Sequence, residues 1–153
     1  MTSWNNPGRV LALDIGTVRI GAAISDPSRI IAQPLGVWQA ENNEWLKNFQ
    51  EALKKYDPSL IILGLPVRTD GKKNEKAEKI LALLEDLKAK FPERNFSTHD
   101  ERFTTVIAQR ALLEADVSRK GRKKVVDKIA AVLILQSWLE ENRNWKNFYS
   151  KHT

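Results

Sequence analysis

The chain has 153 residues, 42% of them hydrophobic and 29% charged, which is the size and apolar content of one globular domain. It contains no cysteine, so disulfide frameworks, zinc–thiolate sites and thiol catalysis are excluded. A formal net charge of +6 favours polyanionic partners such as nucleic acid.

The N-terminal segment lacks the apolar core of a signal peptide, and no apolar run approaches the roughly 20 residues needed to cross a bilayer. We therefore expect a soluble, cytoplasmic protein that does not contact membranes. We expect one domain over residues 1–143, followed by a surface tail over residues 144–153.

The first third of the chain has the pattern of short strands. Apolar runs at residues 10–13 and 20–24 predict two strands, joined by a tight turn at Gly16–Thr17. Residues 30–32 and 34–37 predict a third, interrupted strand. Three strands with short links form an antiparallel meander.

Helical and extended patterns then alternate. Apolar residues at helical spacing predict a helix over residues 45–56, and a second, longer one whose apolar face runs from Ala77 to Leu87 and which ends near Phe91–Pro92. Each of these helices is followed by a predicted strand, at residues 60–63 and, with a weaker signal, at residues 95–99. Because helical crossovers connect parallel strands, strands four and five should run parallel to strand one.

Two more helices complete the prediction, one over residues 104–115 and a largely apolar one over residues 125–139. The fold class is therefore α/β. We predict a mixed five-stranded sheet, three antiparallel strands followed by two parallel ones, flanked by helices.

Acidic residues stand where three of the predicted elements end or begin. Asp14 follows the first strand, Asp100 and Glu101 follow the fifth, and Asp127 begins the last helix. The functional crevice of an open α/β sheet lies at the carboxyl ends of its parallel strands, so the acids of strands one and five converge there. Asp127 shares a helical face with two alanines and Ile134, and such small residues let a helix approach a sheet closely.

Each acid also has an ordinary structural explanation. Asp14 would stabilise the turn as an Asx-type residue, and Asp100 or Glu101 would pair with Arg102 on the surface. Asp127 would complement the helix macrodipole, an effect of about 0.3 to 1 kcal/mol. Successive strand residues point to opposite sides, so only one of Asp100 and Glu101 faces the site, and the pattern leaves open which one.

Carboxylates in a chain with no cysteine and only two histidines suit a hard cation, Mg²⁺ or Mn²⁺. Two such ions roughly 3.5–4 Å apart can activate water and stabilise the leaving oxygen of a phosphodiester. The candidate ligands are Asp14, Asp100, Glu101 and Asp127. His99 adjoins these acids, but a structural role is favoured over proton transfer for a histidine on a strand.

Basic residues gather in one loop before the last helix: Arg119, Lys120, Arg122, Lys123 and Lys124. Together with Arg19 and Arg102 they are candidates for holding phosphates, a role that positions a substrate without reading its sequence. The ordinary alternative for the loop is a solvated charge run.

Four segments of the chain resemble, in order, the YqgF (RuvX) family: Asp14–Pro27, Gly64–Pro66 with Asp70–Gly71, Asp100–Thr105 and Lys124–Leu135. The resemblance covers nearly the whole chain. It implies an RNase H-like fold related to RuvC-type Holliday-junction resolvases, and a role in maturing the 5′ end of pre-16S ribosomal RNA.

By the same resemblance Asp14, Glu101 and Asp127 are the metal-binding catalytic acids. The sequence departs from these related proteins at two places. RuvC-type resolvases carry an acid at the end of the second parallel strand, whereas residues 63–66 contain none, and Val18 stands where many family members have a lysine. A nuclease fold therefore transfers more directly to this chain than junction resolution does.

The predicted function is a metal-dependent endonuclease acting on structured RNA, with the ribosomal small-subunit precursor as partner and a monomer or homodimer as the working form. The alternatives are a Holliday-junction resolvase acting on branched DNA and a non-catalytic nucleic-acid-binding module. A sugar-kinase or actin-type ATPase, which Asp14–Thr17 also resembles, is disfavoured because those proteins duplicate the fold.

Overall fold

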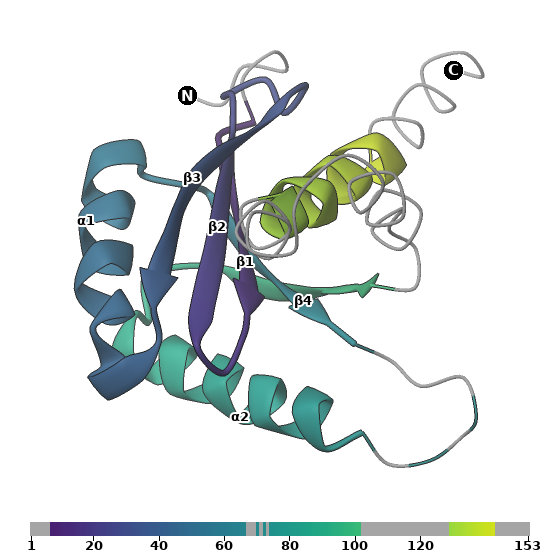
Figure 1. The fold of residues 1–153 in the computed structure, drawn as a ribbon. Helices are drawn as coiled ribbons and strands as arrows, with labels where there is room; N and C mark the ends of the chain where they lie inside the picture. The colour runs from purple at the N-terminus through teal and green to yellow at the C-terminus, as the bar shows by residue number, and fades with distance from the viewer. Residues whose placement is uncertain (1–6, 67–69, 71, 73, 102–128, 143–153) are drawn as a thin grey trace, which may run out of the picture.

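A five-stranded sheet forms the centre of the computed structural model, which describes residues 7–66, 70, 72, 74–101 and 129–142 (Figure 1). The strands are β1 (Val10–Ile15), β2 (Arg19–Ser25), β3 (Ala32–Gln39), β4 (Leu60–Leu65) and β5 (Phe96–Asp100). The helices are η1 (Glu41–Asn43), α1 (Trp45–Tyr56), α2 (Glu75–Lys90) and a helix over residues 129–142.

The order of the strands is β3-β2-β1-β4-β5. β2 pairs antiparallel with both β1 and β3, whereas β4 pairs parallel with β1 and with β5. The predicted mixed sheet, a meander followed by two parallel strands, is confirmed. The carboxyl ends of the parallel strands β1, β4 and β5 consequently lie at the same end of the sheet.

The third strand differs from its prediction. β3 runs without interruption from Ala32, and the preceding Ile30 and Ile31 lie outside it with 49% and 56% of their surface exposed. The Asp26 carboxylate accepts hydrogen bonds from the backbone N–H groups of these two isoleucines, which holds them in the turn after β2. Pro34 does not break the strand because β3 is at the edge of the sheet, where a missing N–H is tolerated.

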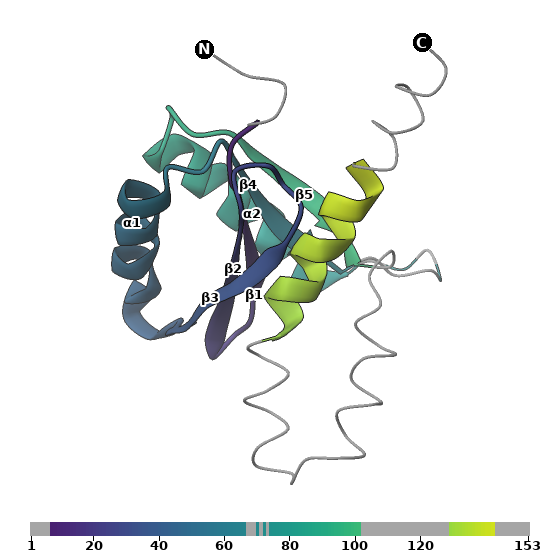
Figure 2. The same cartoon turned by 90° about the horizontal axis from the view of Figure 1, so that it is seen from above.

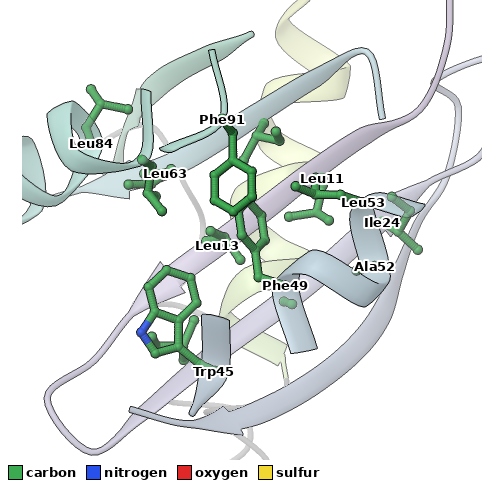
Figure 3. Close-up of a cluster of buried hydrophobic side chains, with 14 of the residues drawn as sticks. Leu11, Leu13, Ile24, Trp45, Phe49, Ala52, Leu53, Leu63, Leu84 and Phe91 are labelled. Carbon is green, nitrogen blue, oxygen red and sulfur yellow. The ribbon is translucent and has the colours of Figure 1, made fainter. Parts of the chain in front are cut away.

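Helices α1 and α2 cover one face of the sheet (Figure 2). α1 buries Trp45, Phe49 and Leu53 at helical spacing, and ends where Asp57 adopts a left-handed φ of 44° before Pro58. Figure 3 shows the side chains that fill this core, among them Leu11, Leu13, Trp45, Phe49, Leu63, Leu84 and Phe91.

The helix over residues 129–142 covers the other face (Figure 2). A second core lies beneath it, formed by Val10, Ala12, Ala23, Ile62, Ala131, Ile134, Leu135 and Leu139. Ala12, Ala23 and Ala131 contribute small side chains to this core, which lets the helix pack close to the sheet.

Several predicted elements lie outside the described residues: the helix over residues 104–115, the start of the last helix at Val125, the basic loop and the tail. Among the residues that the structure does describe, no helix is both long enough and apolar enough to cross a membrane.

Candidate active site

Asp14 lies near the carboxyl end of β1 on the face covered by the helix over residues 129–142. Leu11 and Leu13 point into the core under α1 and α2, whereas Val10 and Ala12 point into the core under that helix. Since side chains alternate along a strand, Asp14 continues the series of Val10 and Ala12. It is half-buried and pairs with Gly21 of β2.

Glu101, directly after β5, reaches back over β4. Its Oε1 atom lies 2.9 Å from the position that a Cβ atom would take on Gly64. The Cδ1 atom of Ile134, from the helix over residues 129–142, lies 2.6 Å from the same position. The Glu101 carboxylate is therefore on the face of the sheet that Asp14 occupies.

The strand register brings these two acids to the same place. Leu13 of β1 pairs with Leu63 of β4, so the next residues along these parallel strands, Asp14 and Gly64, lie side by side. Neighbouring strands are about 4.8 Å apart, which puts a carboxylate over Gly64 roughly one strand spacing from Asp14. Two acidic residues that are far apart in the sequence therefore lie at the same end of the sheet, on the same face.

Asp100 faces the opposite way. His99 on β5 points towards the helix over residues 129–142, where its Nε2 atom lies 3.2 Å from Ser137 Oγ. By alternation Asp100 points to the side of α1 and α2, where Phe96 also packs. Glu101 therefore shares the face of Asp14, and Asp100 does not.

His99 is 5% exposed, and burial lowers its pKa by more than the nearby carboxylates of Glu141 and Asp100 raise it. A neutral imidazole hydrogen-bonded to Ser137 is a structural link between strand and helix, in line with the role favoured from the sequence. Sequence reasoning missed Ser137, which lies among the apolar residues Leu135, Trp138 and Leu139 of this helix.

Arg19 lies on the same face of the sheet. Ala23 of β2 packs under the helix over residues 129–142, so Gly21 and Arg19, two and four residues earlier, share its orientation. Arg19 is thus two residues from Gly21, the partner of Asp14. The short loop between β1 and β2 is closed by a 3.0 Å hydrogen bond from the N–H of Gly16 to the carbonyl of Arg19.

The remaining predicted site residues lie outside the described residues: Arg102, Arg119, Lys120, Arg122, Lys123, Lys124 and Asp127. Within the part of the chain that the structure describes, no group of three or more acidic or histidine side chains could hold a metal ion. Of the predicted site residues that the structure describes, Asp14, Glu101 and Arg19 lie on the same face of the sheet, and Glu101 lies over Gly64.

The fold defines the class of protein first. A solved structure of Thermus thermophilus RuvC in complex with a Holliday junction superposes with a TM-score of 0.51 at 15% identity. The alignment covers 85% of this chain and 92% of that chain. The chain thus has the RNase H-like fold of the RuvC-like resolvases, as the sequence predicted.

The family follows from closer relatives. A family model described as "RuvX: Holliday junction resolvase" matches residues 8–141. A Dictyoglomus turgidum protein, provisionally named pre-16S rRNA nuclease, is 45% identical over 133 residues, which cover 86% of this chain and 94% of the relative. A Thermoanaerobacter pseudethanolicus protein with the same provisional name is 41% identical, covering 89% of this chain and 99% of the relative. The chain belongs to the RuvX family.

Proposed function

We propose that this protein is a metal-dependent endonuclease that hydrolyses phosphodiester bonds of structured RNA and processes the 5′ end of precursor 16S rRNA. The observation that carries the proposal is the Glu101 carboxylate lying over Gly64 beside Asp14. Support for the substrate comes from the relatives, which carry the provisional name pre-16S rRNA nuclease at 41 to 45% identity. The proposal includes the cytoplasmic location expected from the sequence.

The donors fit a hard divalent cation. Asp14 and Glu101 offer only carboxylate oxygens, the ligands that Mg²⁺ and Mn²⁺ prefer. We assign Asp127, two residues before the described helix, as the third ligand, and take Glu101 in place of Asp100 on strand five. A bound ion would supply Lewis-acid stabilisation of charge on the phosphate and a more acidic water.

The chain's own residues position the substrate. Arg19 carries a positive charge on the face that holds Asp14, where a guanidinium can bind a phosphate in a bidentate manner. Arg19 lies two residues from Gly21, which pairs with Asp14, and in this position it would direct the scissile phosphate towards Asp14 and Glu101. Arg102 and the basic loop are proposed to hold the flanking phosphates.

A four-way DNA junction is the second candidate substrate, because the matching family model is described as a Holliday junction resolvase. The hydrolytic chemistry is the same for both substrates. A module that binds nucleic acid without cleaving it is the third possibility, and it predicts no response to metal.

The test incubates the purified protein with a 16S rRNA precursor, an unstructured RNA and a four-way DNA junction, each with Mn²⁺. We expect cleavage of the precursor, and a rate at least about 100-fold lower for Asp14→Asn, because loss of a metal ligand removes several kcal/mol of transition-state stabilisation. Asp86→Asn makes the same charge change on the exposed surface of α2 and should cleave normally.

A parallel melting experiment separates the three candidates. Mn²⁺ should raise the melting temperature of the wild type and of Asp86→Asn, and raise that of Asp14→Asn much less, since a ligand that binds only the folded state stabilises it. Cleavage by Asp14→Asn at the wild-type rate would overturn the proposal. Junction cleavage alone would favour the resolvase, and absence of both cleavage and metal stabilisation would favour the binding module.

A further inference from the structure

Gly64 stands out among the residues of β4. The other five, Leu60, Ile61, Ile62, Leu63 and Leu65, carry the bulky apolar side chains that suit a central strand. Glycine in the interior of a strand costs stability, and often marks a place where another group approaches the backbone closely. Gly64 is buried near the carboxyl end of the strand, beside Asp14.

The backbone does not require glycine here. Gly64 keeps the ladder pairing of β4 with His99 of β5, and it is not among the residues with positive φ. What the missing side chain provides is space. Two groups use this space, Oε1 of Glu101 at 2.9 Å and Cδ1 of Ile134 at 2.6 Å from the position of a Cβ atom.

We propose that Gly64 is a positioning residue for Glu101: its missing side chain forms the seat on which the Glu101 carboxylate lies over the sheet, beside Asp14. The consequence for metal binding rests on the proposed function, whereas the seat itself is a contact of the folded chain. Positioning matters because a metal site tolerates changes of only about 0.2 Å in ligand distance.

An alanine at position 64 would crowd two side chains at once, those of Ile134 and Glu101, and a second substitution separates the two effects. Gly64→Ala pushes against both Ile134 and Glu101, but both contacts are with the ends of flexible side chains, so the chain still folds. Ile134→Val removes Cδ1, and the next atom of that side chain, Cγ1, is 3.5 Å away, an ordinary contact. In the double variant Gly64→Ala/Ile134→Val only the Glu101 carboxylate remains crowded.

The experiment compares the wild type, Ile134→Val, Gly64→Ala/Ile134→Val and Glu101→Gln by Mn²⁺-dependent melting and by cleavage. Ile134→Val should need the same Mn²⁺ concentration as the wild type for half of the full stabilisation. The double variant should need roughly 10- to 100-fold more, the usual effect of losing a group that supports a metal ligand. Saturating Mn²⁺ should restore part of its cleavage rate. An unchanged Mn²⁺ requirement in the double variant overturns the inference.

A metal-free measurement tests the seat independently of the proposed function. In the Ile134→Val background, Gly64→Ala should lower the midpoint of urea unfolding, and should lower it less when Glu101 is also replaced by alanine, because the crowded carboxylate is then gone. Equal losses with and without the Glu101 side chain show that no seat exists. If the wild type neither binds Mn²⁺ nor cleaves, the proposed function fails, and the urea measurement still decides the role of Gly64.

Discussion

Individual carboxylates in this chain have separate tasks, and Asp26 has a purely structural one. It follows β2, at the end of the sheet opposite to the end where Asp14 lies. Its Oδ1 atom accepts hydrogen bonds of 2.7 and 2.8 Å from the N–H groups of Ile30 and Ile31. Burial raises the pKa of Asp26, but backbone hydrogen bonds from Ile31, Ile30, Asp26 itself and Ser28 together outweigh burial and hold the pKa below its ordinary value of 3.8. The charged form is therefore favoured in the folded state.

A carboxyl group whose pKa is lower in the folded state stabilises the protein above its unfolded pKa, and this contribution is lost as the pH falls through the folded pKa. Asp26→Asn keeps an acceptor oxygen but loses the charge. We expect a loss of about 0.5 to 1 kcal/mol in the free energy of unfolding at pH 7, reduced because the site is partly exposed. The difference from the wild type should shrink below about pH 4. Urea unfolding across pH measures this, and a difference that does not depend on pH would contradict it.

At the scale of elements, one hydrogen bond links β5 to the helix over residues 129–142. His99 is buried on the strand that leads to Glu101, and its Nε2 atom lies 3.2 Å from Ser137 Oγ on the helix. The same helix presses Ile134 against Gly64. The position of the helix over the sheet is consequently coupled to the strand end that carries Glu101.

Ser137→Ala should lower the free energy of unfolding by about 1 to 3 kcal/mol, because it leaves a buried imidazole nitrogen without the hydroxyl that pairs with it. Ser97→Ala, the same change at an exposed position of β5, should stay within about 0.5 kcal/mol of the wild type. Chemical denaturation of the three proteins provides the comparison. Equal stability of the two serine variants would show that the link between strand and helix contributes little.

For the whole molecule, the net charge of +6 predicts binding to nucleic acid that depends strongly on salt. If about four phosphates are neutralised, affinity for a structured RNA should fall roughly 100-fold between about 50 and 200 mM salt. Arg19→Gln should reduce the slope of log affinity against log salt by about one, whereas Lys79→Gln on the exposed surface of α2 should leave it unchanged. Fluorescence anisotropy measures both slopes, and an affinity independent of salt would exclude phosphate-dominated binding.

Much of the fold could be predicted from local patterns. Alternating and helical spacing identified the five strands and the helices α1 and α2. The short links predicted that the first three strands are antiparallel, and the helical crossovers predicted that β4 and β5 run parallel to β1. The prediction was wrong for the third strand, because the apolar pair Ile30–Ile31 reads as strand although the Asp26 carboxylate holds it in a turn. A hydrogen bond between a side chain and a backbone several residues away leaves no periodic signal.

The sequence by itself determined the class of fold, the family resemblance and the placing of Asp14 and Glu101 at strand ends, because these depend on local periodicity and on motifs. Only the tertiary structure decided that Glu101 and not Asp100 shares the face of Asp14, and that Gly64 provides the space for its carboxylate. The physical reason is that such distances depend on strand register and on the height of a helix above the sheet. Packing between distant segments sets both of these, and no local pattern encodes them.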